Sequence, residues 1–109
     1  MANVFTNAKK DLTTNGETVV YTVPASTTGI IKSIIVSEDS GNADTITLTI
    51  TDASSNVFSL FKTKAVSANA TVELLSQPLV LQESEILKAT AATANRLHIV
   101  VSVLEINRS

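Results

Sequence analysis

The strongest indication of the fold is the stretch Thr45-Ile46-Thr47-Leu48-Thr49-Ile50-Thr51, in which apolar and polar side chains alternate without a break. Successive side chains of a β-strand point to opposite faces, so this stretch predicts a strand with Ile46, Leu48 and Ile50 in a core. The four threonines then face water or a polar neighbour. A helix would spread the three apolar residues around its circumference, so a helix is excluded here.

Turn-forming clusters such as Asn15-Gly16 and Asp39-Ser40-Gly41-Asn42 divide the remaining sequence into further short runs with strand character. The predicted strands are Glu17–Val23, Gly29–Glu38, Ala43–Asp52, Asn56–Lys64, Ala70–Leu75, Pro78–Leu81, Ile86–Thr90 and Arg96–Ile106. Eight short strands are typical of an all-β sandwich or barrel. We therefore expect a single-domain antiparallel β-sandwich that is jelly-roll-like, although immunoglobulin-like connectivity would present a similar strand pattern.

Length and composition agree with one folded domain. The chain has 109 residues, of which 44% are hydrophobic and 17% charged, and 36 of them are the β-branched Thr, Val and Ile. The absence of cysteine excludes disulfides and thiolate zinc sites, and a net charge of −2 argues against nucleic-acid binding. The first residues lack the apolar run of a secretory signal, and no stretch approaches the length of a membrane span.

Two predicted strands are apolar on both faces. Gly29–Glu38 begins Gly-Ile-Ile-Lys-Ser-Ile-Ile-Val, and Arg96–Ile106 places Val100, Leu104 and Ile106 opposite its other apolar side chains. A sandwich buries one face of each sheet, so the second face needs a cover. The N-terminal segment, a loop or another subunit supplies that cover. Residues 1–16 are an N-terminal arm or a first strand preceding the sandwich at 17–109.

Catalytic chemistry is sparse in this sequence. His98 is the single histidine and lies within a predicted strand, where we expect a half-buried position or a subunit contact. The nucleophile motif Gly-x-Ser-x-Gly is missing, and the ten carboxylates are scattered, mostly in turns. The aromatic residues are Phe5, Tyr21, Phe58 and Phe61, and the last two are predicted to lie in the core, which weakens a sugar-binding function. We expect no enzyme, no catalytic residue and no cofactor.

Two charged features have a structural and a functional interpretation. The acidic run Glu38–Asp44 does not match the spacing of an EF-hand calcium loop, so we predict an acidic solvated turn and no metal site. Lys62 and Lys64 alternate at the end of a predicted strand, and Lys32 interrupts an apolar one. Lysines placed in this way either protect a sheet edge from open-ended pairing or belong to ordinary solvated surface.

The order of the segments from residue 17 to residue 106 resembles that of small virion structural proteins of tailed bacteriophages, notably those that infect cyanobacteria. Two stretches carry the likeness. The first is Tyr21-Thr22-Val23-Pro24, with the Thr/Gly turn that leads into Lys32-Ser33-Ile34. The second is the closing strand around Leu97-His98-Ile99-Val100. The resemblance implies a β-sandwich, self-association and a place in the head, neck or tail of a phage particle.

Together these observations lead to a non-enzymatic virion protein made in the cytoplasm of the bacterial host. The leading hypothesis is a homotrimeric capsid decoration (cement) protein that binds and stabilises the major capsid protein, or another virion protein, with no nucleic-acid or membrane partner. The alternatives are a tail, baseplate or fibre component and a carbohydrate-binding module. The predicted interface residues are Val4, Phe5, His98, Val100, Leu104 and Ile106.

Overall fold

The computed structural model describes residues 2–108, and within them it contains nine strands and no helix. The strands are β1 (Ala2–Leu12), β2 (Thr18–Thr22), β3 (Thr27–Glu38), β4 (Asp44–Thr51), β5 (Val57–Val66), β6 (Thr71–Glu73), β7 (Leu79–Leu81), β8 (Ile86–Ala91) and β9 (Leu97–Asn107). All eight predicted strands are present, and β1 is the ninth. Within the N-terminal segment, Ala2–Leu12 form a strand that pairs with β9.

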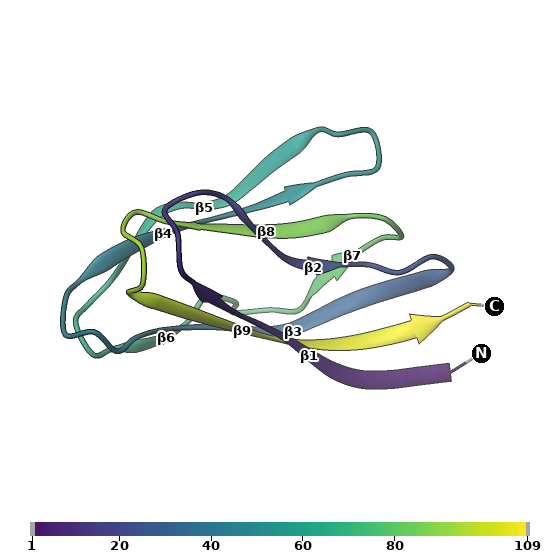
Figure 1. The fold of residues 1–109 in the computed structure, drawn as a ribbon. Coiled ribbons are helices and arrows are strands. Elements are labelled where there is room, and N and C mark those ends of the chain that lie inside the picture. Colours follow the sequence, from purple (N-terminus) through teal and green to yellow (C-terminus); the bar gives the residue numbers. More distant parts are fainter. Residues whose placement is uncertain (1, 109) are drawn as a thin grey trace.

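The strands form two antiparallel sheets that pack as a β-sandwich (Figure 1). Sheet A has the order β1-β9-β3, with β6 and β7 both paired to the far side of β3, and sheet B has the order β2-β8-β4-β5. The first strand thus lies beside the last, whereas in an immunoglobulin sandwich it lies beside the second. With β6 and β7 counted as one interrupted strand, the pairing is that of a jelly roll.

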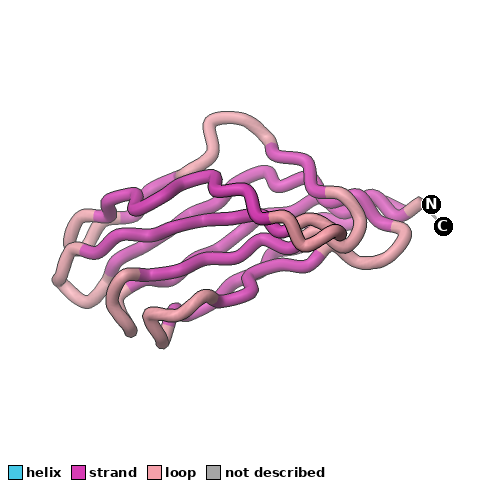
Figure 2. Tube along the Cα trace, turned by 90° about the horizontal axis from the view of Figure 1, so that it is seen from above, coloured by secondary structure: helices cyan, strands magenta, loops and turns pink. Residues whose placement is uncertain are grey.

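The strands run along the length of the molecule, and both termini lie at the same end (Figure 2). The core lies between the sheets and contains the residues that the alternating sequence of β4 predicts. Ile46 and Leu48 are fully buried, and Ile50 is nearly so. From sheet A they meet side chains of β3 and β9, namely Ile31, Ile34, Val36, Leu97, Ile99, Val101 and Val103.

The threonine face of β4 is less open than the alternation suggests. Because β5 and β8 flank β4 on both sides, Thr45, Thr47 and Thr49 are half-buried and Thr51 is buried. Among the described residues, the hydroxyls of Thr49 and Thr51 have no hydrogen-bond partner. The prediction that the threonines face water or a polar neighbour is therefore wrong for Thr51.

The prediction that Phe58 lies in the core is also wrong. Its side chain is 56% exposed, while Phe61 is half-buried and packs against the core. The register between β4 and β5 shifts twice, between Ile46 and Thr49, and β5 is the outermost strand of sheet B. Each shift changes which β5 side chains face the core, so alternation alone misplaces Phe58.

One buried contact ties the two sheets together at the end of the sandwich near the termini. The Tyr21 hydroxyl of β2 donates a hydrogen bond of 2.6 Å to Glu105 of β9. Burial, together with this bond to Glu105, raises the pKa of Tyr21 above its ordinary value. Gly29 of β3 makes room for the ring, because a Cβ at that position would lie 3.2 Å from the Tyr21 hydroxyl oxygen.

Glu38 anchors the loop that follows β3, so the prediction of a solvated acidic turn is wrong for this residue. Its side chain is buried, and its carboxylate accepts hydrogen bonds from the Ser40 hydroxyl and from three backbone N–H groups, those of Ser40 (2.8 Å), Gly41 (3.1 Å) and Asn69 (2.9 Å). Burial raises the pKa of Glu38, but these hydrogen bonds outweigh it and lower the pKa to about 2. Asp44 is buried as well and accepts the N–H of Thr93, which leaves Asp39 as the exposed acid of the run.

Candidate interaction surface

The second apolar faces of β3 and β9 form the outer face of sheet A. The buried residues Ile31 and Val103 point into the sandwich, so their neighbours Ile30 and Leu104 point outward. The N-terminal segment does not cover this face, because β1 lies beside β9 within the same sheet. The N-terminal segment, one of the three covers expected from the sequence, is therefore ruled out, which leaves a loop or another subunit.

An apolar row crosses the outer face from one edge of sheet A to the other. The register places Val80 of β7 opposite Ile30 of β3, Ile30 opposite Leu104 of β9, and Leu104 opposite Phe5 of β1. Directly opposite side chains in an antiparallel sheet are in contact range. The two ends of the row are open to solvent, with Phe5 76% and Val80 55% exposed, while Ile30 and Leu104 are half-buried.

A row of polar side chains lies beside this apolar row. A second, shorter apolar row follows and has a charged residue at each end. Asn7, Ser102 and Ser33 occupy the adjacent row. Beyond them Val100 and Ile35 lie opposite each other, with Lys9 of β1 at one end and Glu73 of β6 at the other. The outer face thus alternates between apolar and polar rows, and its second apolar row ends in charges of opposite sign.

Five of the six predicted interface residues lie on this face. They come from β1 and β9, which are neighbouring strands of sheet A. Phe5 and Leu104 are direct neighbours, and Val100 is 38% exposed. Ile106 and His98 are half-buried on the same side of β9. Val4 is exposed, but strand alternation directs its side chain to the opposite side of β1 from Phe5.

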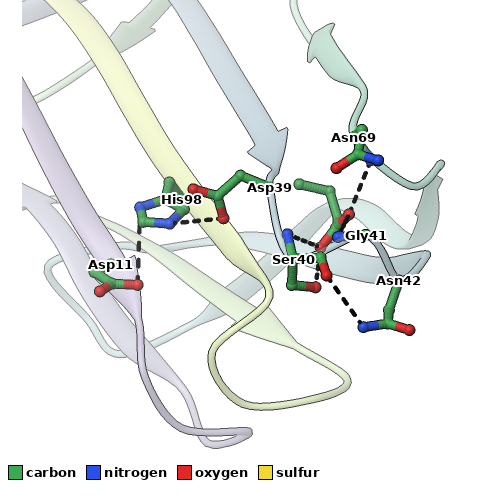
Figure 3. A network of polar contacts seen from close by, with 8 residues as sticks. Asp11, Asp39, Ser40, Gly41, Asn42, Asn69 and His98 are labelled. Carbon is green, nitrogen blue, oxygen red and sulfur yellow. Dashed lines mark hydrogen bonds and ion pairs between the residues drawn. The ribbon is translucent and has the colours of Figure 1, made fainter.

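His98 is held between two carboxylates at the end of sheet A away from the termini (Figure 3). Its Nε2 lies 3.2 Å from Asp39 Oδ1, and its Nδ1 lies 3.8 Å from Asp11 Oδ1. Asp11 comes from β1 and Asp39 follows β3, so the imidazole links the three neighbouring strands of sheet A. The side chains of Asp11 and Asp39 are exposed, and that of His98 is 40% exposed.

Sequence reasoning missed Ile30 and Val80 as members of the surface. Val80 lies on β7, which has three residues and is too short to show alternation. Ile30 lies just before a register shift between Ile31 and Ser33, and the exposed Lys32 there breaks the regular alternation of side chains along β3. The signal available in the sequence was the doubly apolar pattern of β3, which indicates an exposed apolar face without saying which residues share it.

Metal-ligating side chains do not gather in the described part of the chain. Residues 2–108 contain no group of three His, Cys, Asp or Glu side chains arranged to hold a metal ion. None of their elements is a helix long and apolar enough to cross a membrane.

Comparison with known proteins gives a likeness of fold. No family model and no curated protein matches the sequence. The structure is similar to that of a protein of the Bacillus endospore appendages, which form a novel family of disulfide-linked pili, with a TM-score of 0.59 over 98% of this chain and 89% of that one. The identity is 10%, so the likeness shows the fold alone. This chain has no cysteine and has no means of forming the disulfide links named for those pili.

A second similar structure is the CBM22-1–GH10 part of a Clostridium thermocellum xylanase 10B in complex with xylohexaose. The TM-score is 0.43 at 12% identity, and the match covers 99% of this chain but 26% of that one. A likeness at that level carries no argument about sugar binding.

Proposed function

We propose that the chain is a non-enzymatic structural protein of a phage particle, a capsid decoration protein that attaches to the major capsid protein through the outer face of sheet A. The observation that carries the proposal is the apolar row Val80–Ile30–Leu104–Phe5, which spans the whole width of that sheet. The resemblance of residues 17–106 to phage virion proteins is the reason for proposing a phage particle as the assembly to which the chain belongs. In this proposal the chain is made in the bacterial host cytoplasm and resides on the virion.

The chemistry of the surface suits a permanent attachment. A solvated antiparallel sheet normally presents polar side chains outward. Here the outward side chains include Phe5, Val80 and Val100, which are large, hydrophobic and exposed to solvent. Contiguous exposed apolar side chains framed by polar ones mark protein interaction surfaces. Burying them against another protein stabilises the complex by about 25 cal/mol for each Å² of apolar area removed from water.

The aromatic residues favour this function over sugar binding. The two exposed phenylalanines, Phe5 and Phe58, lie on opposite sheets, so they do not form a common stacking platform. Tyr21 is buried and its hydroxyl is bonded to Glu105.

The test is mass spectrometry and immunogold electron microscopy on purified phage particles from host cells that produce this chain. We expect the chain to copurify with the particles and the gold to lie on the head. Absence of the chain from the particles would overturn the proposal, and gold confined to the tail would overturn the decoration role.

A matched pair of variants tests the surface itself. Val80→Asp places a charge at the open end of the apolar row and should prevent incorporation into particles. Val57→Asp changes an equally exposed valine on sheet B and should be incorporated like the wild type. Equal incorporation of both variants would reject the outer face of sheet A as the attachment surface.

A further inference from the structure

The four sheet edges of this sandwich differ in how well they are protected from pairing with another strand. On sheet B, β5 has two register shifts, a left-handed residue at Thr63 (φ 54°) and the two lysines Lys62 and Lys64. The other edge of that sheet, β2, has five residues and one register shift. On sheet A, β6 and β7 have three residues each. Bulges, short length and lysine are the devices that keep an edge from pairing.

The fourth edge, β1, has a long unprotected portion. It runs for eleven residues, from Ala2 to Leu12, in one unbroken register with β9. It contains no proline and no left-handed residue. Its charged residues, Lys9, Lys10 and Asp11, all lie in its last four positions, so the first seven positions form an uncharged edge.

The backbone groups of alternate β1 residues point to this open edge. Arg108 N–H donates to Ser26 before β3, so even-numbered residues of β9 direct their backbone groups toward β3 and odd-numbered ones toward β1. The register pairs odd-numbered residues of β9 with even-numbered residues of β1. The N–H and C=O groups of Asn3, Phe5 and Asn7 therefore face outward from the edge.

We propose that β1 pairs antiparallel with β1 of a second copy of this chain, with Phe5 opposite Phe5 of that copy. In this register Asn3 of each copy lies opposite Asn7 of the other, and all of these positions have outward-facing backbone groups, as a ladder of hydrogen bonds requires. The two sheets A then join into one sheet across a two-fold axis.

The occupant is a second copy because the edge is complementary to itself. The apolar row ends at Phe5, and pairing Phe5 with itself continues the row through Leu104, Ile30 and Val80 of the second copy. The same register places Lys9 and Lys10 of the two copies at opposite ends of the joined strands, so like charges do not meet. Sliding the second strand by four residues would instead place Lys9 opposite Phe5 and interrupt the row.

The biological role of this pairing rests on the proposed function. Pairing would double the width of the surface through which the protein attaches to the capsid protein. It joins chains in pairs, so two chains, or six if trimers form, are expected in solution. The pairing is nevertheless measured on the purified chain, so it fails or holds independently of whether the chain is found on particles.

A cysteine cross-link tests the register. The chain has no cysteine, so a disulfide in Phe5→Cys must join two chains. Directly opposite residues of a hydrogen-bonded antiparallel pair have Cα atoms about 5.5 Å apart, within the range that a disulfide bridges. We expect Phe5→Cys to form a covalent dimer under mild oxidation. Phe58→Cys, an exposed phenylalanine on sheet B, is the control and should stay a single chain.

Amide hydrogen exchange on the wild-type chain tests the pairing without a substitution. The N–H groups of Asn3, Phe5 and Asn7 should exchange at least about tenfold more slowly than that of Asp11, which faces the same edge four residues beyond Asn7. Equal exchange rates at these positions, a mass of one or three chains, or no cross-link at position 5 would each overturn the proposal.

Discussion

Buried polar side chains at the ends of strands hold this small sandwich together at the level of single residues. Glu38 pins the loop after β3 to Asn69 in the loop before β6. Tyr21 pins β2 to Glu105 on β9. Both contacts join segments far apart in the sequence, so neither was predictable from local patterns.

The depressed pKa of Glu38 makes stability depend on pH. The folded carboxyl has a pKa of about 2 against an ordinary value of 4.5, so it stabilises the fold fully above pH 4.5 and loses that contribution as the pH falls toward 2. Glu38→Gln should therefore lower the free energy of unfolding at pH 7, with a smaller difference from wild type at pH 3. Urea unfolding at the two pH values measures this. The exposed Glu17→Gln serves as control, and an equal loss at both pH values would contradict the assignment.

The close approach of Gly29 to Tyr21 gives a second prediction. Gly29→Ala places a methyl group 3.2 Å from the Tyr21 hydroxyl oxygen and 3.4 Å from the Val23 side chain, so the ring, which is held by its bond to Glu105, must shift by a few tenths of an ångström. Overpacking of this kind costs about 1–3 kcal/mol of unfolding free energy. Tyr21 is the only tyrosine and tryptophan is absent, so its fluorescence reports the displacement directly. An unchanged spectrum with unchanged stability would refute the contact.

At the level of elements, β4 supplies the centre of the core. Leu48 is fully buried, and Leu48→Ala should lower the free energy of unfolding by about 2–5 kcal/mol. Val57→Ala on the exposed part of β5 should change it by about 0.5 kcal/mol or less. Denaturant unfolding of both variants checks the prediction, and a loss below about 1 kcal/mol for Leu48→Ala would place the core on the wrong face of β4.

Strands were predictable from this sequence because their signals are local. The alternation of β4 and the turn clusters between strands place eight elements close to their observed bounds. The exposure of Phe58 was not predictable, since it depends on register shifts that arise between strands. The same holds for the surface. The apolar faces of β3 and β9 are visible in the sequence, whereas the row that includes Val80 exists only through cross-strand register.

At the level of the whole molecule, sheet A carries apolar side chains on both of its faces. Its inner face forms the core and its outer face carries the apolar rows. Val100→Asp should therefore weaken attachment to the particle while leaving folding of the chain intact, because Val100 already contacts solvent on the outer face. Incorporation into particles and thermal unfolding of the same variant separate the two effects. Unfolding of the variant would assign Val100 to the core instead.

The attachment proposed for sheet A can be seen by cryo-electron microscopy of phage particles that contain this chain. We expect density for the β-sandwich on the head shell, with Val80 and Leu104 of sheet A against a neighbouring protein and Phe58 of sheet B facing solvent. Density that is missing from the shell, or a domain docked through sheet B with the outer face of sheet A in solvent, would reject the proposal.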